Sequence, residues 1–375
     1  MLRLGTQYTV LATRTMANIL DIRRRIRSVV NTRQITKAMK VVSAAKLRRA
    51  QDRALAARPY AQMLTNVLKS LVARTEIYDP ETGEPKHPLL AQRAENNILL
   101  IVVTGDKGLA GAFSANITKA ASRFLESKAG KNVDIEAIGR KGRDFLRRRY
   151  PAAAVQTRSL VEIEDSLETQ PEAGERAGTI QITGEHVGVL GKLGFGQARA
   201  LAESVIGRYQ REEIDAVYVV FNEFKSVIAQ RLIVEQILPI EQIGEQAVRL
   251  AEEMTEEEKK KAKEAAISAG VGMRGSEPAG EHAAAQFGTA QVDYIYEQPP
   301  EELFRSLLPK YVAIQIFRAL LESVAAEHAA RMTAMDSATS NATDMIDSLT
   351  LAMNRARQAK ITKEIIEIVS GAAAM

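Results

Sequence analysis

Apolar residues recur at helical spacing along the first part of the chain. Between Asn18 and about Arg74, steps of three and four residues separate them, and this is typical of the seam of a coiled coil. The spacing slips in phase before Ile35, and Pro59 should kink or locally break the helix. The apolar positions are Ile19, Ile22, Ile26, Val29, Ile35, Met39 and Val42, followed by Ala50, Ala54, Ala57, Ala61, Leu64, Leu68 and Leu71.

The last part of the chain carries a second apolar stripe of the same kind. It predicts a helix from Glu301 to about Val369, with no proline after Pro309. About 60 helical residues would extend over roughly 90 Å, too far to bury a stripe against one small domain. The other long helix is the simplest partner. The two helices should run antiparallel, because the chain leaves by one and returns by the other.

Between the two long helices, apolar strands alternate with amphipathic helices. Strands separated by helices favour a parallel-rich α/β layer with helices on its faces. The loop Tyr78–Pro88 precedes this region, and the acidic stretch from Val161 to Glu185 is expected to be irregular. The predicted strands are Asn97–Thr104, Val133–Ile138, Ala216–Asn222 and Gln230–Pro239, and the predicted helices are Phe113–Lys128, Lys141–Arg149 and Leu193–Tyr209.

The pattern changes again between Glu241 and Val292. This stretch contains a charged helix former without an apolar stripe, followed by a glycine-rich segment, and we interpret it as an exposed insertion. The fold class is α/β, with a long antiparallel coiled coil of the N- and C-terminal helices plus a central Rossmann-like α/β domain. The expected organisation is 1–15 as an extension or upstream start, 16–76 as the N-terminal coiled-coil helix, 77–300 as the central domain with the charged insertion 241–292, and 301–375 as the C-terminal coiled-coil helix.

The amino-acid composition excludes several kinds of functional site. The 375 residues include no cysteine, which excludes disulfides, thiolate metal sites and a cysteine nucleophile. The four histidines lie far apart in sequence, and no apolar run is long enough to span a bilayer. Residues 1–15 could form a transit-like segment, but we favour an upstream start codon, because Met16-Ala17-Asn18 reads as a natural beginning.

Three stretches carry candidate chemistry. The glycines of Thr104–Gly111 follow a strand and precede a helix, but they match neither a Walker A loop nor GxGxxG, so a tight turn is favoured over a nucleotide site. The helix from Arg23 to Arg58 is strongly basic, with Asp52 as its one acid, and should attract phosphate or acidic protein surfaces. Polar residues at Asn354–Lys363 interrupt the last apolar stripe, and the apolar end that follows needs a cover. No catalytic constellation is assembled.

Sequence motifs at both ends of the chain resemble one known family. The stretches Asn31–Lys40 and Ala45–Gln51, together with Asn354–Ile365 and Ile368–Ala372, resemble the terminal signatures of the gamma subunit of the rotary F-type ATP synthase. The positions of a further C-terminal signature are Glu322, Ser323, Glu327, Arg331, Met332, Met335, Ala338, Asn341 and Ala342.

The resemblance implies a mechanical role without a catalytic site or cofactor. The paired helices would turn inside a ring of alpha and beta subunits, while the α/β body would stand on the membrane rotor ring of c subunits and touch the epsilon subunit. It also implies a peripheral location on the cytoplasmic face of a bacterial inner membrane, or alternatively on the matrix side of the mitochondrial inner membrane. The positions that match the family's contacts with surrounding subunits are Met39, Lys40, Lys46, Arg48, Arg357, Gln358 and Thr362.

Two other classes of function stay open on the sequence. The basic helix would suit a coiled-coil protein that binds nucleic acid, although the scarcity of aromatic residues gives base stacking no support and we expect no nucleic-acid partner. The turn Gly105–Gly111 would suit a small α/β enzyme that binds a nucleotide.

Overall fold

The computed structural model describes residues 19–72, 85–157, 178–240, 243, 248–271 and 296–373. The chain divides into two compact units. One, which we call the end unit, consists of Met1–Lys40 and Met335–Met375. The other, the body, consists of Val41–Ala334. The expected loop at Tyr78–Pro88, most of the acidic stretch before Gly178 and the last part of the insertion lie largely outside the described residues.

Two helices are far longer than the others, as the sequence predicts. Helix α1 spans Ile19–Val72, and helix α7 spans Pro300–Ala373. Helix α1 continues through Pro59, so the predicted local break is wrong. The alanines on either side, Ala57 and Ala61, pack against the hydrophobic cluster that includes Leu64 and Leu68. This packing offsets the loss of the backbone hydrogen bond that proline cannot donate.

The buried face of α1 keeps one phase along its whole length. Ile35 and Val42 were predicted on the seam but are 59% and 55% exposed, whereas Thr36, Lys40 and Ser43 are buried. These three polar residues continue the steps of three and four between Val29 and Leu47, so the helix has no phase slip. The slip is an artefact of following apolar side chains alone.

The body is built on a seven-stranded sheet in the order β3-β4-β2-β1-β5-β6-β7. Strand β1 pairs in parallel with both β2 and β5, and β4 pairs in parallel with β2 and β3. Strands β6 and β7 extend the sheet antiparallel. The bounds are β1 Asn97–Val103, β2 Asn132–Ile138, β3 Ala152–Thr157, β4 Ile180–His186, β5 Ala216–Phe224, β6 Gln230–Leu238 and β7 Val248–Glu253.

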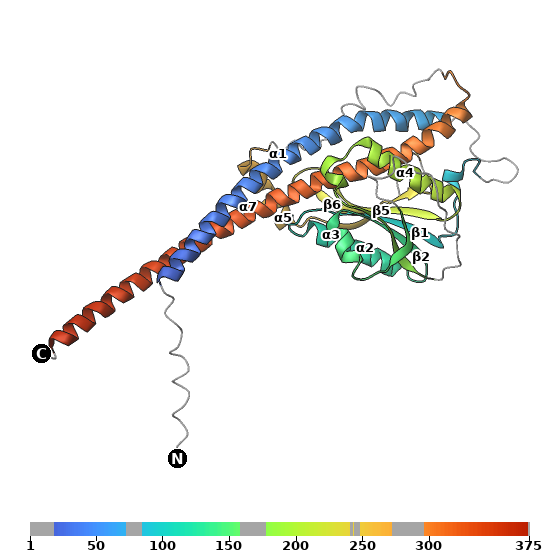
Figure 1. Ribbon diagram of the computed structural model, residues 1–375. Coiled ribbons are helices and arrows are strands. Elements are labelled where there is room, and N and C mark those ends of the chain that lie inside the picture. Colours follow the sequence, from blue (N-terminus) through green and yellow to red (C-terminus); the bar gives the residue numbers. More distant parts are fainter. Residues whose placement is uncertain are drawn as a thin grey trace, which may run out of the picture. The chain divides into compact units, whose positions relative to one another are not determined.

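Helices cover both faces of this sheet, so β1 is buried from Ile98 to Val103 (Figure 1). Leu99, Ile101 and Val103 face a core shared with α4 (Phe195–Gln210). The alternate residues of β1 face a second core, which is shared with α2 (Phe113–Ser127) and α3 (Arg140–Leu146). The remaining short elements are the 3-10 helices η1 (Pro88–Leu90) and η2 (Val189–Lys192).

The described part of the insertion is integrated into the body. It forms β7 and a helix, α5 (Glu256–Ser268), which begins with a capping box between Thr255 and Glu258. Ala262, Ala265 and Ala266 are buried in the core that also holds Ala44, Leu47 and Ala50 of α1. The expectation that this helix has no apolar stripe is therefore wrong, because small alanines form the stripe.

Strands β3 and β4 were missed in the sequence. The stretch predicted to be irregular from Val161 to Glu185 contains most of β4. Its polar residues hide the strand pattern, yet Thr183 and His186 are buried. Residues 158–177, between these two strands, are outside the described part of the chain.

Candidate functional site: the terminal helices and the glycine-rich turn

Polar contacts join the two long helices within the end unit. The Lys40 ammonium lies 2.5 Å from a carboxylate oxygen of Asp336. The hydroxyls of Thr36 and Thr339 are 2.7 Å apart. As the residue number rises along α1 it falls along α7, so the helices are antiparallel, as predicted.

The family-matched positions of α1 have different surroundings. Lys40 is buried and held by Asp336, and its neighbour Met39 is half-buried. Lys46 and Arg48, which belong to the body, are exposed. The Arg48 guanidinium donates a hydrogen bond to the carbonyl oxygen of Gly270 at 3.0 Å, so it joins α1 to the insertion. Among these four positions, Lys46 is the exposed cation without a hydrogen bond or ion pair to the described residues.

The far end of α7 is bare within the described residues. In the register set by Lys40–Asp336, the first residue of α1, Ile19, lies level with about Arg357. From Arg357 onward every residue whose side chain is described is exposed, including Gln358 and Thr362. The exposed apolar residues at this end are Ile361, Ile365, Ile366, Ile368 and Val369, which are between 48% and 72% exposed.

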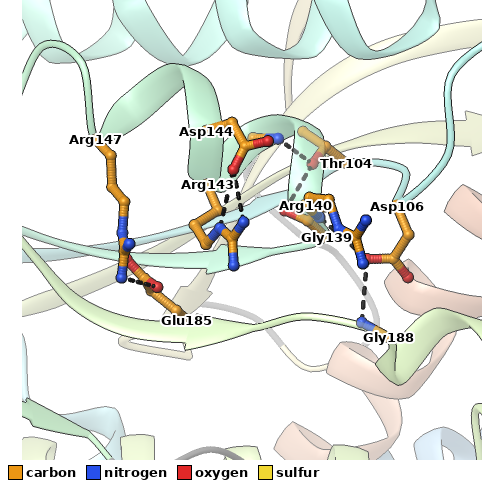
Figure 2. Close-up of polar contacts among 10 residues, drawn as sticks. Thr104, Asp106, Gly139, Arg140, Arg143, Asp144, Arg147, Glu185 and Gly188 are labelled. Atoms are coloured by element: carbon orange, nitrogen blue, oxygen red, sulfur yellow. Dashed lines mark hydrogen bonds and ion pairs between the residues drawn. The ribbon is translucent and has the colours of Figure 1, made fainter.

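Polar side chains fix the turn between β1 and α2 in the body (Figure 2). The Thr104 hydroxyl accepts a hydrogen bond from the Gly142 amide at 2.7 Å. The Asp106 carboxylate accepts from the amides of Arg140 and Gly188 at 3.0 and 3.1 Å. The ends of three neighbouring parallel strands are thus tied together at the carboxyl edge of the sheet.

The crevice between β1 and β5 is where an open α/β sheet normally binds its ligand, because the strand order reverses there. Helix α7 occupies this position. A Cβ atom placed on Gly105 would lie 2.7 Å from a carboxylate oxygen of Glu327. Gly105 therefore leaves room for the Glu327 carboxylate, whereas Gly111 has a φ of +56° and supplies the turn itself.

A buried ion pair holds α7 against the glycine-rich turn. Glu327 and Arg331 are 7% and 8% exposed, and they form an ion pair one helical turn apart. The Arg331 guanidinium also reaches the carbonyl oxygens of Lys107 and Gly108, both at 3.4 Å. Burial raises the pKa of the Glu327 carboxyl, and the Arg331 charge opposes that rise.

The same cluster keeps a histidine neutral. Burial, with help from Arg331, lowers the pKa of His328 to about 4. Its Nδ1 lies 3.2 Å from the Arg331 guanidinium, which can only donate, so Nδ1 accepts. Sequence reasoning placed Glu327 and Arg331 in a family signature but gave them no role. The signal was two charges spaced four residues apart in a stretch that is otherwise apolar.

The residues that the structure describes hold no cluster of histidines and carboxylates suited to a metal ion. Within the same ranges, no helix is long and apolar enough to cross a bilayer. The structure therefore describes a chain whose ends pair as helices and whose α/β crevice is closed by one of those helices. These features define the class: an α/β protein whose N- and C-terminal helices pair with each other.

Comparison with known proteins identifies the family. A family model described as ATP synthase matches residues 18–375. The chain is 47% identical to the ATP synthase gamma chain of Solibacter usitatus over 359 residues, which are 96% of this chain and 99% of that one. It is 42% identical to the gamma chain of Anaeromyxobacter sp. (strain Fw109-5), over 96% of this chain and 100% of that one. It is also 41% identical to that of Geobacter metallireducens, over 95% and 98%.

A chain from the central stalk and c-ring of the Tetrahymena thermophila mitochondrial ATP synthase is similar at a TM-score of 0.44 and 20% identity, over 81% of this chain and 99% of that one. This likeness is too weak to carry an argument. The sequence matches are sufficient: the chain belongs to the ATP synthase gamma family. Members of this family form the central-stalk rotor of the F-type enzyme and are non-catalytic subunits, so the resemblance stated from the sequence is confirmed.

Proposed function

We propose that the bare end of α7 turns inside a ring of alpha and beta subunits and transmits rotation to the catalytic sites of the beta subunits. The observation that carries this proposal is the exposed stretch from Arg357 onward. Exposed isoleucines at the end of a helix need an apolar surface to cover them. Loops of a surrounding ring would supply such a sleeve.

The polar residues before the tip would make the contacts that change during rotation. Arg357, Gln358 and Thr362 lie within one sector of α7, because successive residues of a helix are about 100° apart. Exposed charge-assisted hydrogen bonds form and break at modest cost, which suits a surface that must release one neighbour and engage the next.

The contacts proposed for α1 divide according to their surroundings. Lys46 is exposed and suited to touch an acidic loop of a beta subunit. Lys40 already pairs with Asp336, and Arg48 already donates to Gly270, so neither is free to bind a neighbouring subunit strongly. They would act mainly by fixing helix α1, which also carries Met39.

The partners proposed for the body are the epsilon subunit and the membrane ring of c subunits. Proton flow through the membrane sector would turn the ring, the body and the paired helices together. We place the assembly on the cytoplasmic face of a bacterial inner membrane, because the full-length relatives named above are bacterial. We expect no nucleic-acid partner, and a gel shift at physiological ionic strength tests that expectation.

The double variant Arg357→Ala/Gln358→Ala tests the role of the polar sector. Proton-coupled ATP turnover in native membranes should fall several-fold, while the amount of assembled complex stays unchanged, because these exposed side chains hold nothing in the described fold. The matched control is Lys363→Ala, which removes one exposed charge from another side of the same helix, where Lys363 lies 3.5 Å from Glu367. Unchanged turnover in the double variant, or an equal loss in the control, would contradict the assigned role.

A further inference from the structure

The face of the body that carries α2 and α3 contains a groove. It lies between these helices and reaches the glycine-rich turn, with a volume of about 640 Å³. Figure 1 shows the two helices on the sheet face opposite to α4. The contacts proposed above for α1 and α7 use no residue of this groove.

The rim of the groove is strongly basic. Five lysines and arginines line it against one acid, Glu126. Among the described residues, none forms an ion pair with four of these cations, Lys107, Lys119, Arg123 and Lys141. The fifth, Arg149, stacks over the Phe145 ring with its guanidinium carbon 4.7 Å from the ring centroid.

Two other arginines of the basic run around α3 are paired with carboxylates. Arg143 pairs with Asp144 at 2.7 Å, and Arg147 pairs with Glu185 at 2.5 Å. Both belong to the basic run around α3, yet neither lines the groove. The carboxylates of Asp144 and Glu185 therefore pair with arginines outside the groove, and the lining of the groove stays positive.

Apolar side chains also line the groove, and one of them belongs to a strained residue. Leu109 is 60% exposed and has a φ of 65°, in the left-handed region that non-glycine residues rarely adopt. Such a conformation costs about 1–3 kcal/mol and is typically kept at functional positions. Ala110, Ala115 and Phe145 continue the apolar lining from the turn into the groove.

We propose that this groove binds an acidic amphipathic helix of another protein chain. The basic residues would pair with carboxylates, and the apolar lining residues Leu109, Ala115 and Phe145 would contact the hydrophobic stripe of the helix. A protein helix fits better than a nucleic acid, because Phe145 is the one aromatic lining residue and Arg149 already stacks on its ring. The proposal concerns residues of the body alone, so it stands or falls separately from the proposed function of the terminal helices.

Site-specific photo-cross-linking of the full chain in cells tests the proposal. A photoreactive phenylalanine replaces Ala115, which is exposed and lines the groove, and in a second preparation it replaces Leu109. The expected result is a cross-link, identified by mass spectrometry, to a helical segment of another chain with a net negative charge. No cross-link from either position would overturn the proposal. So would a cross-link to phospholipid, to nucleic acid or to this chain's own acidic residues 158–177.

Charge reversal then separates specific docking from chance proximity. Lys119→Glu/Arg123→Glu should lower the cross-link yield about tenfold, because like charges would then face each other at the rim. The matched control Lys260→Glu/Lys263→Glu reverses two exposed charges on α5 and should leave the yield unchanged. Changing acids of the captured segment to lysine should restore the yield with the first variant. Equal losses in both variants, or no restoration, would overturn the proposal.

Discussion

The ion pair between α7 and the glycine-rich turn gives a stringent test of how the body holds the long helix. The perturbation is Arg331→Met, which keeps the length of the side chain and removes its charge. Glu327 would then be left 7% exposed without its cation. Removing one partner of a buried pair typically costs about 3–5 kcal/mol. The two carbonyl contacts at 3.4 Å are long and contribute little to that figure.

A second variant separates the loss of attraction from the penalty of an unpaired charge. In Glu327→Gln/Arg331→Met no carboxylate is left at position 327, so the double variant should be more stable than Arg331→Met alone, by about 1 kcal/mol or more. The measurement is urea unfolding of the full chain followed by circular dichroism. An exposed control, Lys263→Met on α5, should shift the free energy of unfolding by no more than about 0.5 kcal/mol.

The pH dependence of the same variant has a definite sign. A carboxyl whose pKa is raised by folding stabilises the native state below its unfolded pKa, and that stability is lost as the pH rises through the folded value. Arg331 opposes the rise in the pKa of Glu327 that burial causes. The Arg331→Met variant should therefore raise the pKa of Glu327 in the folded state further. The difference between wild type and Arg331→Met should therefore be largest near neutral pH and should narrow in acid. The loss of Arg331 also removes one cause of the lowered pKa of His328, so His328 is protonated more easily in the folded variant. This too narrows the difference in stability between wild type and variant in acid.

Two results would refute this reasoning. One is a cost below about 1 kcal/mol for Arg331→Met near neutral pH, a value typical of an exposed pair. The other is a difference that widens as the pH falls. The first would mean that Glu327 is solvated in the folded chain, and the second that the loss of Arg331 does not raise the pKa of Glu327.

Two further changes test the same region by independent means. Gly105→Ala should destabilise the chain by about 1–3 kcal/mol, because the added Cβ would lie 2.7 Å from the Glu327 carboxylate, and urea unfolding measures this; Gly191→Ala, with no atom within 4 Å, is the control. Folding depresses the pKa of His328 from 6.5 to about 4, so stability should fall as the pH drops through that window, by up to about 1.4 kcal/mol per pH unit. His328→Gln should flatten this slope, and a slope unchanged by the substitution would assign it to other groups.

Much of the fold could be predicted because its strongest patterns are local. The seams of α1 and α7, and the apolar run of β1, each follow from the spacing of side chains within one segment. Strand β4 could not be predicted in this way, because its buried positions include Thr183 and His186, whose burial depends on the neighbouring strands.

The candidate site shows the same division between local and distant signals. The sequence predicted that the apolar end of α7 needs a cover, and its isoleucines are exposed among the described residues. The ion pair between Lys40 and Asp336 was not predicted, because these residues are 296 positions apart in sequence. The polar seam at Thr36 and Lys40 was hidden for the same reason: only a partner helix makes a buried lysine favourable.

The central claim is that this chain works as the rotor of a larger assembly, and the composition of its native complex tests that most directly. The tagged full chain, purified from native membranes in mild detergent, should elute as a large complex that hydrolyses ATP. Mass spectrometry should identify alpha and beta subunits among the other chains. Recovery of the chain alone, or in a complex that lacks both of these subunits, would contradict the account.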